Sequence, residues 1–372
     1  MKKKLQTFLN LHLSNVLGLG ARNILEPFLI ALNNNNNNNN NNIKILNAYF
    51  PPLVKSLKNL TLTKPIEVRH FERKLPNGLS RFLEIIFWKP SNPEQFFLVF
   101  GDIPLRRLRS QILYLHSTLI IQSISEHSFL LKIKYTVLKF LFFLNINNVN
   151  LIIVQSKVMR SQLFIKYPNI NIVIMPPPPG EIYYKSSYKF NFSKKRFNLN
   201  KGKIKGFYPA SFYEHKNHAL LKDISSYDLP ISELILTINP DKNPDPFCNF
   251  IKCTGEISNE RVYDYYLNTD ALFFLSLTES YGLPLVEAMF LGIPIICPNL
   301  PYARELCQDQ AIYFNVVSAE SFKQAVNELI LRLQEGWKPN YSKCLKSISS
   351  GWDVYASKIL EHIDNLPYRP NN

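Results

Sequence analysis

The sequence predicts an α/β protein built from two parallel-sheet units. Two observations support this prediction: short apolar runs alternate with amphipathic stretches along the chain, and a proline tract interrupts the alternation near the middle. Such alternation is typical of βαβ units with a parallel sheet. The length of 372 residues favours two domains. The content of 46% hydrophobic and 13% aromatic residues excludes a disordered chain.

Six apolar runs in the first half are predicted strands, and amphipathic helices lie between several of them. The ten asparagines at 33–42 predict a loop between the first helix and the second strand, because Asn prefers turns. Pro176–Pro179 with Gly180 ends the sixth strand, since proline cannot continue a regular element. The predicted strands are 6–13, 43–50, 95–102, 111–116, 150–156 and 171–175, and the predicted helices are 20–32, 126–144 and 156–166.

The alternation resumes after a basic, aromatic stretch that is predicted to link two domains. Ser318 is a predicted N-cap, because its side chain can accept a hydrogen bond from the first turn of the following helix. The predicted strands are 203–210, 233–238, 249–255, 270–277, 293–298 and 311–315, and the helices are 217–224, 259–268, 283–292, 318–333 and about 352–363. The predicted divisions are a first domain at 1–178, a linker at 179–203, a second domain at 204–348 and a closing helix at 349–372 that returns to the first domain.

The net charge of +15 lies entirely in the N-terminal half. Residues 1–180 hold 22 Lys and Arg against 7 Asp and Glu, whereas the remaining residues hold 21 of each. A basic half attracts phosphates, anionic lipid or nucleic acid, although general basicity for solubility is an alternative. The five cysteines are scattered and odd in number, which favours a reducing compartment over a disulfide framework.

No membrane-spanning helix is expected from the sequence. Polar residues interrupt the apolar stretch that follows Met1–Lys4, so a first strand is predicted there instead of a signal peptide. The stretch 129–144 contains Lys132, Lys134 and Lys139 beside Phe140, Phe142 and Phe143. These lysines suit a helix lying on an anionic membrane, and an ordinary surface helix remains the alternative.

The segment from Thr278 to Gly292 carries the clearest chemistry. It follows an apolar strand and contains two carboxylates, with Glu279 in a loop and Glu287 inside an otherwise apolar helix. Gly282 can adopt positive φ, and a helix N-terminus near Pro284 offers free N–H groups to a phosphate. Two carboxylates that can accept hydrogen bonds from hydroxyl groups, beside a site for an anion, suit a nucleotide-sugar. The alternative is that both glutamates form internal salt bridges.

The motif E-S-Y-G-L-P-L-V-E at 279–287 resembles the E-x7-E signature of the retaining glycosyltransferases of family 4, which have the GT-B fold. The resemblance implies two Rossmann-like domains with parallel sheets facing across a cleft. It is specific over about 205–365. The flanking segments that resemble the family are GIPII at 292–296, PYARELCQDQAIYF at 301–314, GEISNERVYDYYLNTDALFF at 255–274, SFYEHKNHALL at 211–221 and the closing helix from Trp352.

By this resemblance, the donor-binding roles fall on named positions of this sequence. Glu279 would contact the hydroxyls of the donor sugar, Glu287 those of the ribose, and Lys216 the diphosphate. A departing nucleoside diphosphate needs cationic stabilisation, which agrees with Lys216. The strand end at 208–212 lacks the Arg that the family often has there. Neutralisation of the diphosphate charge would therefore depend on Lys216, on helix N-termini or on a cation from the basic half. The implied backbone contacts are Ser280, Tyr281 and Gly282 in the same pocket, and Gly255 and Ile257 near the nucleobase.

The first half supplies further candidates. Gly18 and Gly20 lie in a turn that, by the resemblance, faces the donor phosphates, with Arg22 just after it; a plain turn is the alternative. His116 ends a predicted strand and resembles the family's His near the donor sugar, although a structural His is also possible. Arg106, Arg107 and Arg109 suit an acceptor pyrophosphate or a solvated loop. No metal site is expected, because His215 and His218, Cys248 and Cys253, and Asp241 and Asp245 each lack further ligands at suitable spacing.

These features together predict a retaining hexosyltransferase-type glycosyltransferase. It would transfer a sugar from a nucleoside-diphosphate sugar to an acceptor hydroxyl, and retention is implied by the resemblance alone. The basic half predicts a lipid-linked saccharide acceptor in cell-surface polysaccharide or lipopolysaccharide synthesis, with peripheral attachment to the cytoplasmic face of a membrane. No cofactor and no nucleic acid partner are expected. The alternatives are another GT-B enzyme, such as a nucleotide-sugar epimerase, and a basic lipid- or nucleic-acid-binding protein.

Overall fold

The chain divides into two compact units in a computed structural model. Residues 1–178 and 349–372 form the first unit, and residues 179–348 form the second. Each unit contains one parallel sheet with helices packed against it. The structure describes residues 7–13, 19–37, 43–50, 66–70, 77–90, 95–122, 129–180, 183, 202–222 and 224–366.

The first unit contains a seven-stranded sheet in the order β3-β2-β1-β4-β5-β6-β7, in which every adjacent pair is parallel. Its central strands are buried on both faces, as their nearly continuous apolar sequences require. The short edge strand β3 was not predicted from the sequence, because its residues EVRH are polar and largely exposed. The strands are β1 Thr7–His12, β2 Ile43–Phe50, β3 Glu67–His70, β4 Phe96–Phe100, β5 Gln111–Tyr114, β6 Val149–Val154 and β7 Ile172–Ile174.

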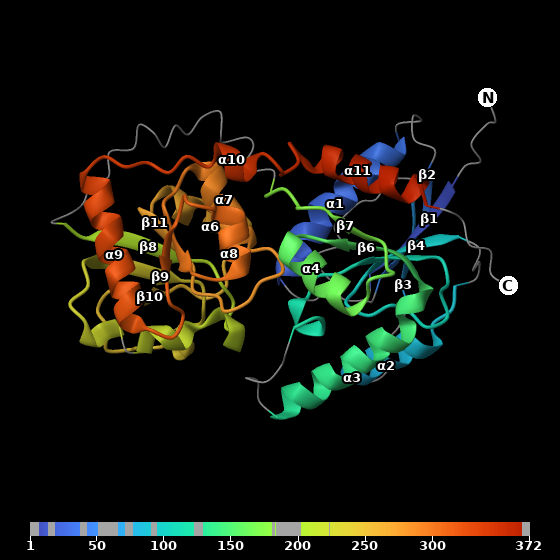
Figure 1. The fold of residues 1–372 in the computed structure, drawn as a ribbon, viewed down its shortest axis with the longest axis horizontal. Helices are drawn as coiled ribbons and strands as arrows, with labels where there is room; N and C mark the ends of the chain where they lie inside the picture. The colour runs from blue at the N-terminus through green and yellow to red at the C-terminus, as the bar shows by residue number, and fades with distance from the viewer. Residues whose placement is uncertain are drawn as a thin grey trace. The chain divides into compact units, whose positions relative to one another are not determined.

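Helices cover both faces of this sheet (Figure 1). On one face, α1 (Leu19–Asn37) and α11 (Trp352–Asp364) lie side by side and share a core with β1, β2 and β4. On the other face, α2 (Asn77–Phe87), α3 (Phe129–Asn145) and α4 (Lys157–Lys166) contribute to a second core. The amphipathic helix α2 was not among the sequence predictions.

The predicted loop at 33–42 is wrong for its first five residues, because α1 continues through Asn37. Asn33 is buried, which is possible because α11 packs against this end of α1. The Asn35 amide donates to the Asp353 carbonyl over 3.2 Å, and the Ser357 hydroxyl donates to Asn35 Oδ1 over 3.3 Å. Tertiary contacts thus extend the helix into the asparagine run, whose last five residues lie outside the described part of the chain.

The last helix, α11, is an integral part of the first unit. Trp352, Tyr355 and Ile359 are buried in the same core as α1. The Tyr355 hydroxyl donates to the Met175 carbonyl over 3.2 Å and lies 2.7 Å from the Tyr114 hydroxyl. Since Tyr355 has only one hydroxyl proton, Tyr114 is the donor between the two phenols. Helix α11 is therefore anchored to β5 and to the residue after β7.

The second unit contains a six-stranded sheet in the order β10-β9-β8-β11-β12-β13, again entirely parallel. The Ser318 side chain accepts a hydrogen bond from Ser321 N over 3.0 Å, which confirms the predicted N-cap of α9. The elements are β8 Ile204–Tyr208, β9 Ile231–Leu236, β10 Ile251–Cys253, α6 Asn259–Leu267, β11 Ala271–Phe273, α7 Leu283–Leu291, β12 Ile295–Pro298, α8 Pro301–Cys307, β13 Ile312–Phe314, α9 Ala319–Gln334 and α10 Ser342–Leu345.

The α-helix predicted at 217–224 is replaced by short 3-10 turns at His218–Lys222 and Ile224–Ser226. Asn217 adopts a left-handed conformation with φ of 55°, which separates these turns from the preceding one at Glu214–Lys216. The backbone then bonds over three residues, as in the hydrogen bond from Leu220 N to the Asn217 carbonyl, 3.1 Å long. The prediction of a regular helix at this position is therefore wrong.

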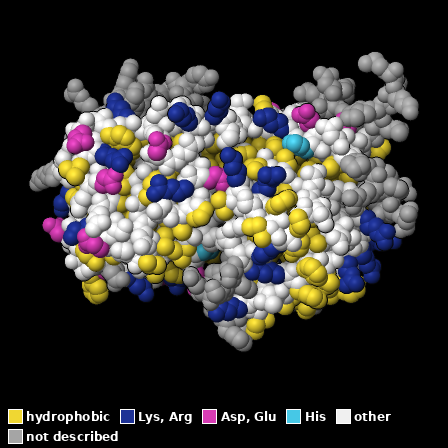
Figure 2. Space-filling model, in the orientation of Figure 1, with side chains coloured by type: hydrophobic (Ala, Val, Ile, Leu, Met, Phe, Trp, Pro, Cys, Tyr) yellow, Lys and Arg dark blue, Asp and Glu magenta, His cyan; other side chains and the backbone are white. Residues whose placement is uncertain are grey.

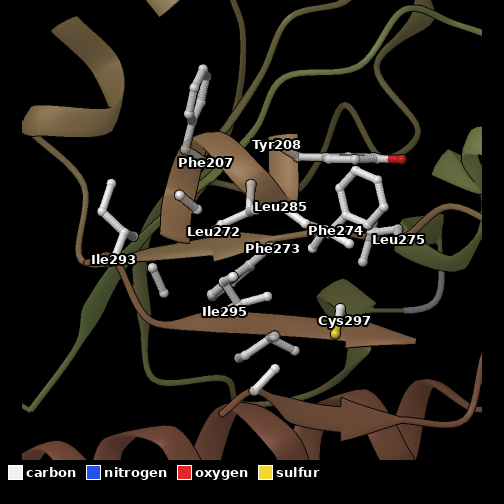
Figure 3. Close-up of a cluster of buried hydrophobic side chains, with 14 of the residues drawn as sticks. Phe207, Tyr208, Leu272, Phe273, Phe274, Leu275, Leu285, Ile293, Ile295 and Cys297 are labelled. Carbon is white, nitrogen blue, oxygen red and sulfur yellow. The ribbon is translucent and has the colours of Figure 1, made fainter. Parts of the chain in front are cut away.

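The core of the second unit lies around its two central strands, β8 and β11 (Figure 3). Phe207, Phe273 and Leu285 are fully buried there. The two strands approach closely at Gly206, where a Cβ atom would lie 2.8 Å from the Phe273 ring. Two Rossmann-like α/β units with parallel sheets confirm the predicted fold class.

Candidate functional site

The loops that follow β8 and β11 bring two charged side chains together at the carboxyl edge of the second sheet. Lys216 ends the 3-10 turn after β8, and Glu279 lies in the loop between β11 and α7. Lys216 Nζ lies 2.5 Å from Glu279 Oε1, and the side chains are 16% and 13% exposed. Ligands of parallel α/β sheets bind at the carboxyl ends of the strands. Both residues were candidates in the sequence analysis, but their pairing with each other was not predicted.

Backbone and side-chain hydrogen bonds hold these two loops against each other. The Tyr208 hydroxyl donates to the Lys216 carbonyl over 2.8 Å. Leu277 N, in the Glu279 loop, donates to the His215 carbonyl over 2.8 Å. The ammonium group and the carboxylate are therefore presented on a fixed backbone, which is the condition for precise binding of a charged ligand.

The residues after Glu279 lead directly into the N-terminus of α7. Gly282 is the N-cap, with φ of 95°, a conformation that favours glycine. A Cβ atom at this position would lie 3.1 Å from Leu285 Cδ1. Pro284 stands in the first turn, where its missing N–H costs no helical hydrogen bond. Ser280, Tyr281 and Gly282 thus lie along the chain between Glu279 and the N-terminus of α7, and their role in a donor pocket stays a prediction.

Glu287 is buried inside α7, and in the described part of the chain its partners are phenols instead of a cation. The Tyr266 hydroxyl donates to Glu287 Oε2 over 3.1 Å, and Tyr183 is a second hydrogen-bond partner. Burial raises the pKa of Glu287 from 4.5 to about 7, and the two hydrogen bonds oppose this shift. The alternative of internal salt bridges therefore describes Glu279 and does not describe Glu287. The tyrosines were not singled out in the sequence, because nothing in their spacing marks them.

Gly255 and Ile257, the predicted nucleobase contacts, follow β10 at the same edge of the sheet. Gly255 has φ of 74°, and its N–H donates to the Ile238 carbonyl over 2.9 Å. A Cβ atom at Gly255 would lie 3.6 Å from Asn239 Oδ1. The amide of Gly255 is thus occupied by the fold, whereas the half-buried side chain of Ile257 offers apolar surface to a flat ring.

The His218 side chain is buried next to the Lys216 loop. Its ring packs against Tyr208 and Phe212, with centroid distances of 5.2 Å and 5.6 Å. Burial, followed by the neighbouring charges of Lys216 and His215, lowers the pKa of His218 to about 4. No group of three His, Cys, Asp or Glu side chains in the described ranges is suitably placed to hold a metal ion.

The carboxyl edge of the first sheet holds a second group of polar residues. His116 follows β5, and burial lowers its pKa to about 4 against the opposing effect of Asp102. Asp102 accepts a hydrogen bond from Ser117 N over 3.0 Å and lies 3.9 Å from Arg81 Nη2. Arg81 was missed because α2 itself was not predicted. His116 is thus a neutral imidazole at neutral pH, beside the Asp102–Arg81 pair. Its predicted role near the donor sugar stays a prediction.

The predicted turn before α1 is described only in part. Gly18 lies outside the described residues, and Gly20 is exposed in the first turn of α1. Arg22 is half-buried on the same turn, and its Nε atom is buried without a hydrogen-bond partner among the described residues. Of the three predicted arginines near 106–109, Arg107 lies with its guanidinium carbon 5.4 Å from the centre of the Phe87 ring.

The exposed face of α3 differs from the one predicted. Phe142 is 1% exposed and belongs to the core, and Lys139 points inward to donate to the Gln122 carbonyl. These two residues therefore do not face outward as expected. In Figure 2, hydrophobic and basic side chains lie next to one another over the region where Figure 1 shows α2 and α3. The exposed apolar residues of α3 are Ile133, Val137, Phe140, Phe143 and Leu144, and those of α2 are Leu79, Phe82 and Phe87.

Membrane-crossing helices are not found in the parts of the chain that the structure describes. None of the helices there combines the length and the apolar character needed to cross a bilayer.

Comparison with known proteins gives a family for part of the second unit. Residues 249–339 match the family Glycosyl transferases group 1. A stretch of 111 residues is 29% identical to the serotype-specific mannosyltransferase WbdA of Escherichia coli. This stretch is 30% of the present chain and only 13% of the relative's length. The matched residues include Glu279 and Glu287.

Solved structures resemble the chain over nearly its whole length. The structure of WaaG, a glycosyltransferase involved in lipopolysaccharide biosynthesis, has a TM-score of 0.62 and 12% identity, and the match covers 96% of this chain and 100% of that one. A glycosyltransferase from Rickettsia africae has a TM-score of 0.61 and 14% identity, with 97% and 98% covered. These likenesses show the fold, which is that of the GT-B glycosyltransferases.

Proposed function

We propose that the protein is a retaining glycosyltransferase that moves a hexosyl group from a nucleoside-diphosphate sugar to an acceptor hydroxyl. The observation that carries this proposal is the Lys216–Glu279 ion pair at the carboxyl edge of the second sheet. A cation for a diphosphate and a carboxylate for sugar hydroxyls meet there, beside the N-terminus of a helix. The Glycosyl transferases group 1 match over 249–339 supports the same reading.

The donor would exchange partners with the ion pair as it binds. The diphosphate takes the place of the Glu279 carboxylate on Lys216, because two negative phosphates attract the ammonium group more strongly than one carboxylate does. Glu279 is then free to accept hydrogen bonds from the sugar. Binding of the complete donor thus converts an internal salt bridge into two separate contacts, one to each end of the bond that will break.

The reaction places its new charge next to Lys216. The bond between the anomeric carbon and the diphosphate oxygen breaks, and its electron pair stays on that oxygen. The acceptor oxygen bonds to the anomeric carbon from the same face, and its proton passes to the departing diphosphate. The Lys216 ammonium group and the N–H groups at the start of α7 stabilise the growing negative charge. This route needs no separate base and no metal.

Glu287 would bind the ribose hydroxyls from within its pocket of tyrosines. With a pKa of about 7, the carboxyl group is partly ionised at neutral pH. Ribose hydroxyls that donate to it would stabilise the ionised form and replace part of its lost hydration. The predicted contributions of Gly255, Ile257, Gly20, Arg22 and His116 stay predictions.

Thermal melting with nucleotides tests the donor site directly. UDP, GDP, TDP and their sugar derivatives are added in turn, because a ligand that binds only the folded state raises the melting temperature by mass action. One nucleotide family should stabilise the protein. Lys216→Ala and Glu279→Ala should each reduce its effect, whereas Lys252→Ala should not, because Lys252 is an exposed lysine paired with Glu233 at 2.6 Å. Absence of stabilisation by every nucleotide would refute the donor site.

Turnover separates the roles of the two glutamates. Glu279→Ala should lower kcat more than donor affinity, because its contacts are to the transferring sugar. Glu287→Ala should mainly weaken donor binding. Wild-type kinetics in both folded variants would refute these assignments. Donor consumed to an isomer, with no nucleoside diphosphate released, would indicate an epimerase instead.

The acceptor side is proposed to work at the cytoplasmic face of a membrane, on a lipid-linked saccharide of surface-polysaccharide synthesis. The support is the mixed apolar and basic face of α3: Phe140 and Phe143 are 59% and 61% exposed. Lys134 is exposed on the same helix, and Lys132 is half-buried. Basic residues near an anionic surface contribute about 1 kcal/mol each, and exposed aromatic rings add apolar burial at the interface.

Co-sedimentation with vesicles tests this attachment. Binding to vesicles of phosphatidylcholine with phosphatidylglycerol should fall as salt rises, and vesicles of phosphatidylcholine alone should bind poorly. Phe140→Ser with Phe143→Ser, and separately Lys132→Gln with Lys134→Gln, should each weaken binding. Phe164→Ser is the matched control, because Phe164 is a similarly exposed phenylalanine on α4. A protein that ignores anionic vesicles at low salt would refute membrane attachment and leave the transferase proposal standing.

A further inference from the structure

We propose that Tyr208, a core tyrosine at the end of β8, is the positioning residue that sets Lys216 for the diphosphate. This inference rests on the proposed function of Lys216. Tyr208 does not itself reach the ligand, since its side chain is fully buried. It acts through its hydroxyl, which is hydrogen-bonded to the backbone carbonyl of Lys216 and to the side chain of Ser276. Ser276 lies between the end of β11 and Glu279.

The hydrogen bonds around Tyr208 have one consistent direction. Its hydroxyl donates to the Lys216 carbonyl over 2.8 Å and lies 3.1 Å from Ser276 Oγ. Because the single phenolic proton goes to the carbonyl, Ser276 must be the donor to Tyr208. The Tyr302 hydroxyl in turn donates to the Ser276 carbonyl over 2.5 Å. Hydrogen bonds from the Ser276 hydroxyl through the Tyr208 hydroxyl therefore end on the backbone of Lys216, and Tyr302 holds the backbone of Ser276.

The ring of Tyr208 makes this anchor rigid. It packs against Phe274 at a centroid distance of 5.8 Å and against His218 at 5.2 Å. Figure 3 shows the ring beside Phe274, with the hydroxyl oxygen at the end of the ring farthest from Phe207. A phenol held by packing on its ring can aim its hydroxyl at only one region, and here that region is the loop after β8.

The loop itself has little regular structure to hold it. Residues 209–217 contain only the single 3-10 turn at Glu214–Lys216, which ends at the left-handed Asn217. A displacement of the Lys216 backbone moves the long side chain with it, and loss of about 1 Å in placement is costly for a charged contact. The Tyr208 hydroxyl therefore matters for binding of the diphosphate, and much less for binding of the nucleoside.

A double-mutant cycle distinguishes positioning of Lys216 from a general contribution to folding. The four proteins are wild type, Tyr208→Phe, Lys216→Ala and the double variant. Each is titrated calorimetrically with UDP, GDP and TDP and with uridine, guanosine and thymidine. Tyr208→Phe keeps the ring and removes only the hydroxyl, so it should weaken diphosphate binding by about 5- to 10-fold, the usual worth of one buried hydrogen bond. Nucleoside binding should stay unchanged.

The cycle gives the decisive comparison. If Tyr208 acts through Lys216, adding Tyr208→Phe to Lys216→Ala should cause no further loss of diphosphate affinity, because the side chain that it positions is already absent. An equal, additive loss in both backgrounds would overturn the proposal. So would a Tyr208→Phe protein that loses nucleoside and diphosphate affinity alike.

Tyr341→Phe is the matched control. Tyr341 is another buried tyrosine of this core, and its hydroxyl donates to the Ile293 carbonyl over 2.9 Å, away from Lys216. Its variant should lose comparable stability and keep its diphosphate affinity. Equal effects of Tyr208→Phe and Tyr341→Phe on that affinity would overturn the positioning role. If Lys216→Ala itself binds diphosphates as the wild type does, the assignment of Lys216 fails, and this inference fails with it.

Discussion

Replacement of Glu287 by glutamine should change how the stability of the second unit depends on pH. In the folded protein the pKa of Glu287 is raised from 4.5 to about 7, and burial is the cause. The folded state thus holds the proton more tightly than the unfolded state does. The resulting stability is fully present below pH 4.5 and is lost as the pH rises through about 7.

The magnitude follows from the size of the shift. At about 1.4 kcal/mol per unit of pKa, ionising this carboxyl group inside the fold costs about 3 kcal/mol in full. Between pH 5 and 8 the wild type should therefore lose about 2 kcal/mol relative to Glu287→Gln, which has no proton to release. The amide keeps an oxygen that can accept from Tyr266, so the pocket remains filled.

Urea denaturation at a series of pH values measures this difference. Hydrogen–deuterium exchange of peptides from β8 to β13 reports unfolding of the second unit separately from the first. Glu328→Gln is the control, because Glu328 is an exposed carboxylate paired with Arg332 on α9. Its variant should follow the wild type at every pH. Parallel curves for the wild type and Glu287→Gln would refute the reasoning, since they would mean that Glu287 titrates alike in both states.

Three further predictions concern packing and ionisation. Gly206→Ala places a methyl group 2.8 Å from the Phe273 ring, so the second unit should lose about 1–3 kcal/mol in the same urea assay; an unchanged midpoint would contradict this. Tyr355→Phe removes the hydrogen bonds with Tyr114 and with the Met175 carbonyl and should cost the first unit about 1–3 kcal/mol, measured from exchange of β5 peptides. His116 has its pKa lowered to about 4 by burial. Its ring-proton NMR signals should not shift between about pH 5.5 and 8, and a titration midpoint near 6.5 would show that the ring is not buried.

The sequence was informative where local pattern and final structure agree. The buried strands of both sheets, the N-cap at Ser318 and the start of α7 at Gly282–Pro284 follow from apolar runs and from residues with narrow backbone preferences. These signals lie within a few positions of the structure that they specify. Glu279 was singled out from its own segment, whereas Lys216 was identified by resemblance to a family. Their contact could not be predicted, since two charged residues 63 positions apart carry no local mark of it.

The failures have a common physical cause, which is tertiary contact. The helix continues past Asn33 because α11, more than 300 residues later in the chain, packs along α1 and bonds to Asn35. The inward turn of Phe142 depends on which face of α3 meets the sheet, and a helix rich in apolar residues all round does not reveal that face. Tyr208 and Tyr183 were not predicted because their hydrogen-bond partners, Lys216 and Glu287, are distant in the sequence or unmarked by it and become neighbours only in the folded protein.

The return of α11 to the first unit has a consequence for how the chain matures on the ribosome. Residues 179–348 are complete before α11 has been synthesised, so the second unit can close first although it comes later in the sequence. Meanwhile Phe28 on α1 and the neighbouring strand β1 lack the cover that Tyr355 and Ile359 provide. The nascent chain must therefore carry an open apolar face through most of its synthesis, and a stop codon before Trp352 would leave that face open permanently while sparing the second unit.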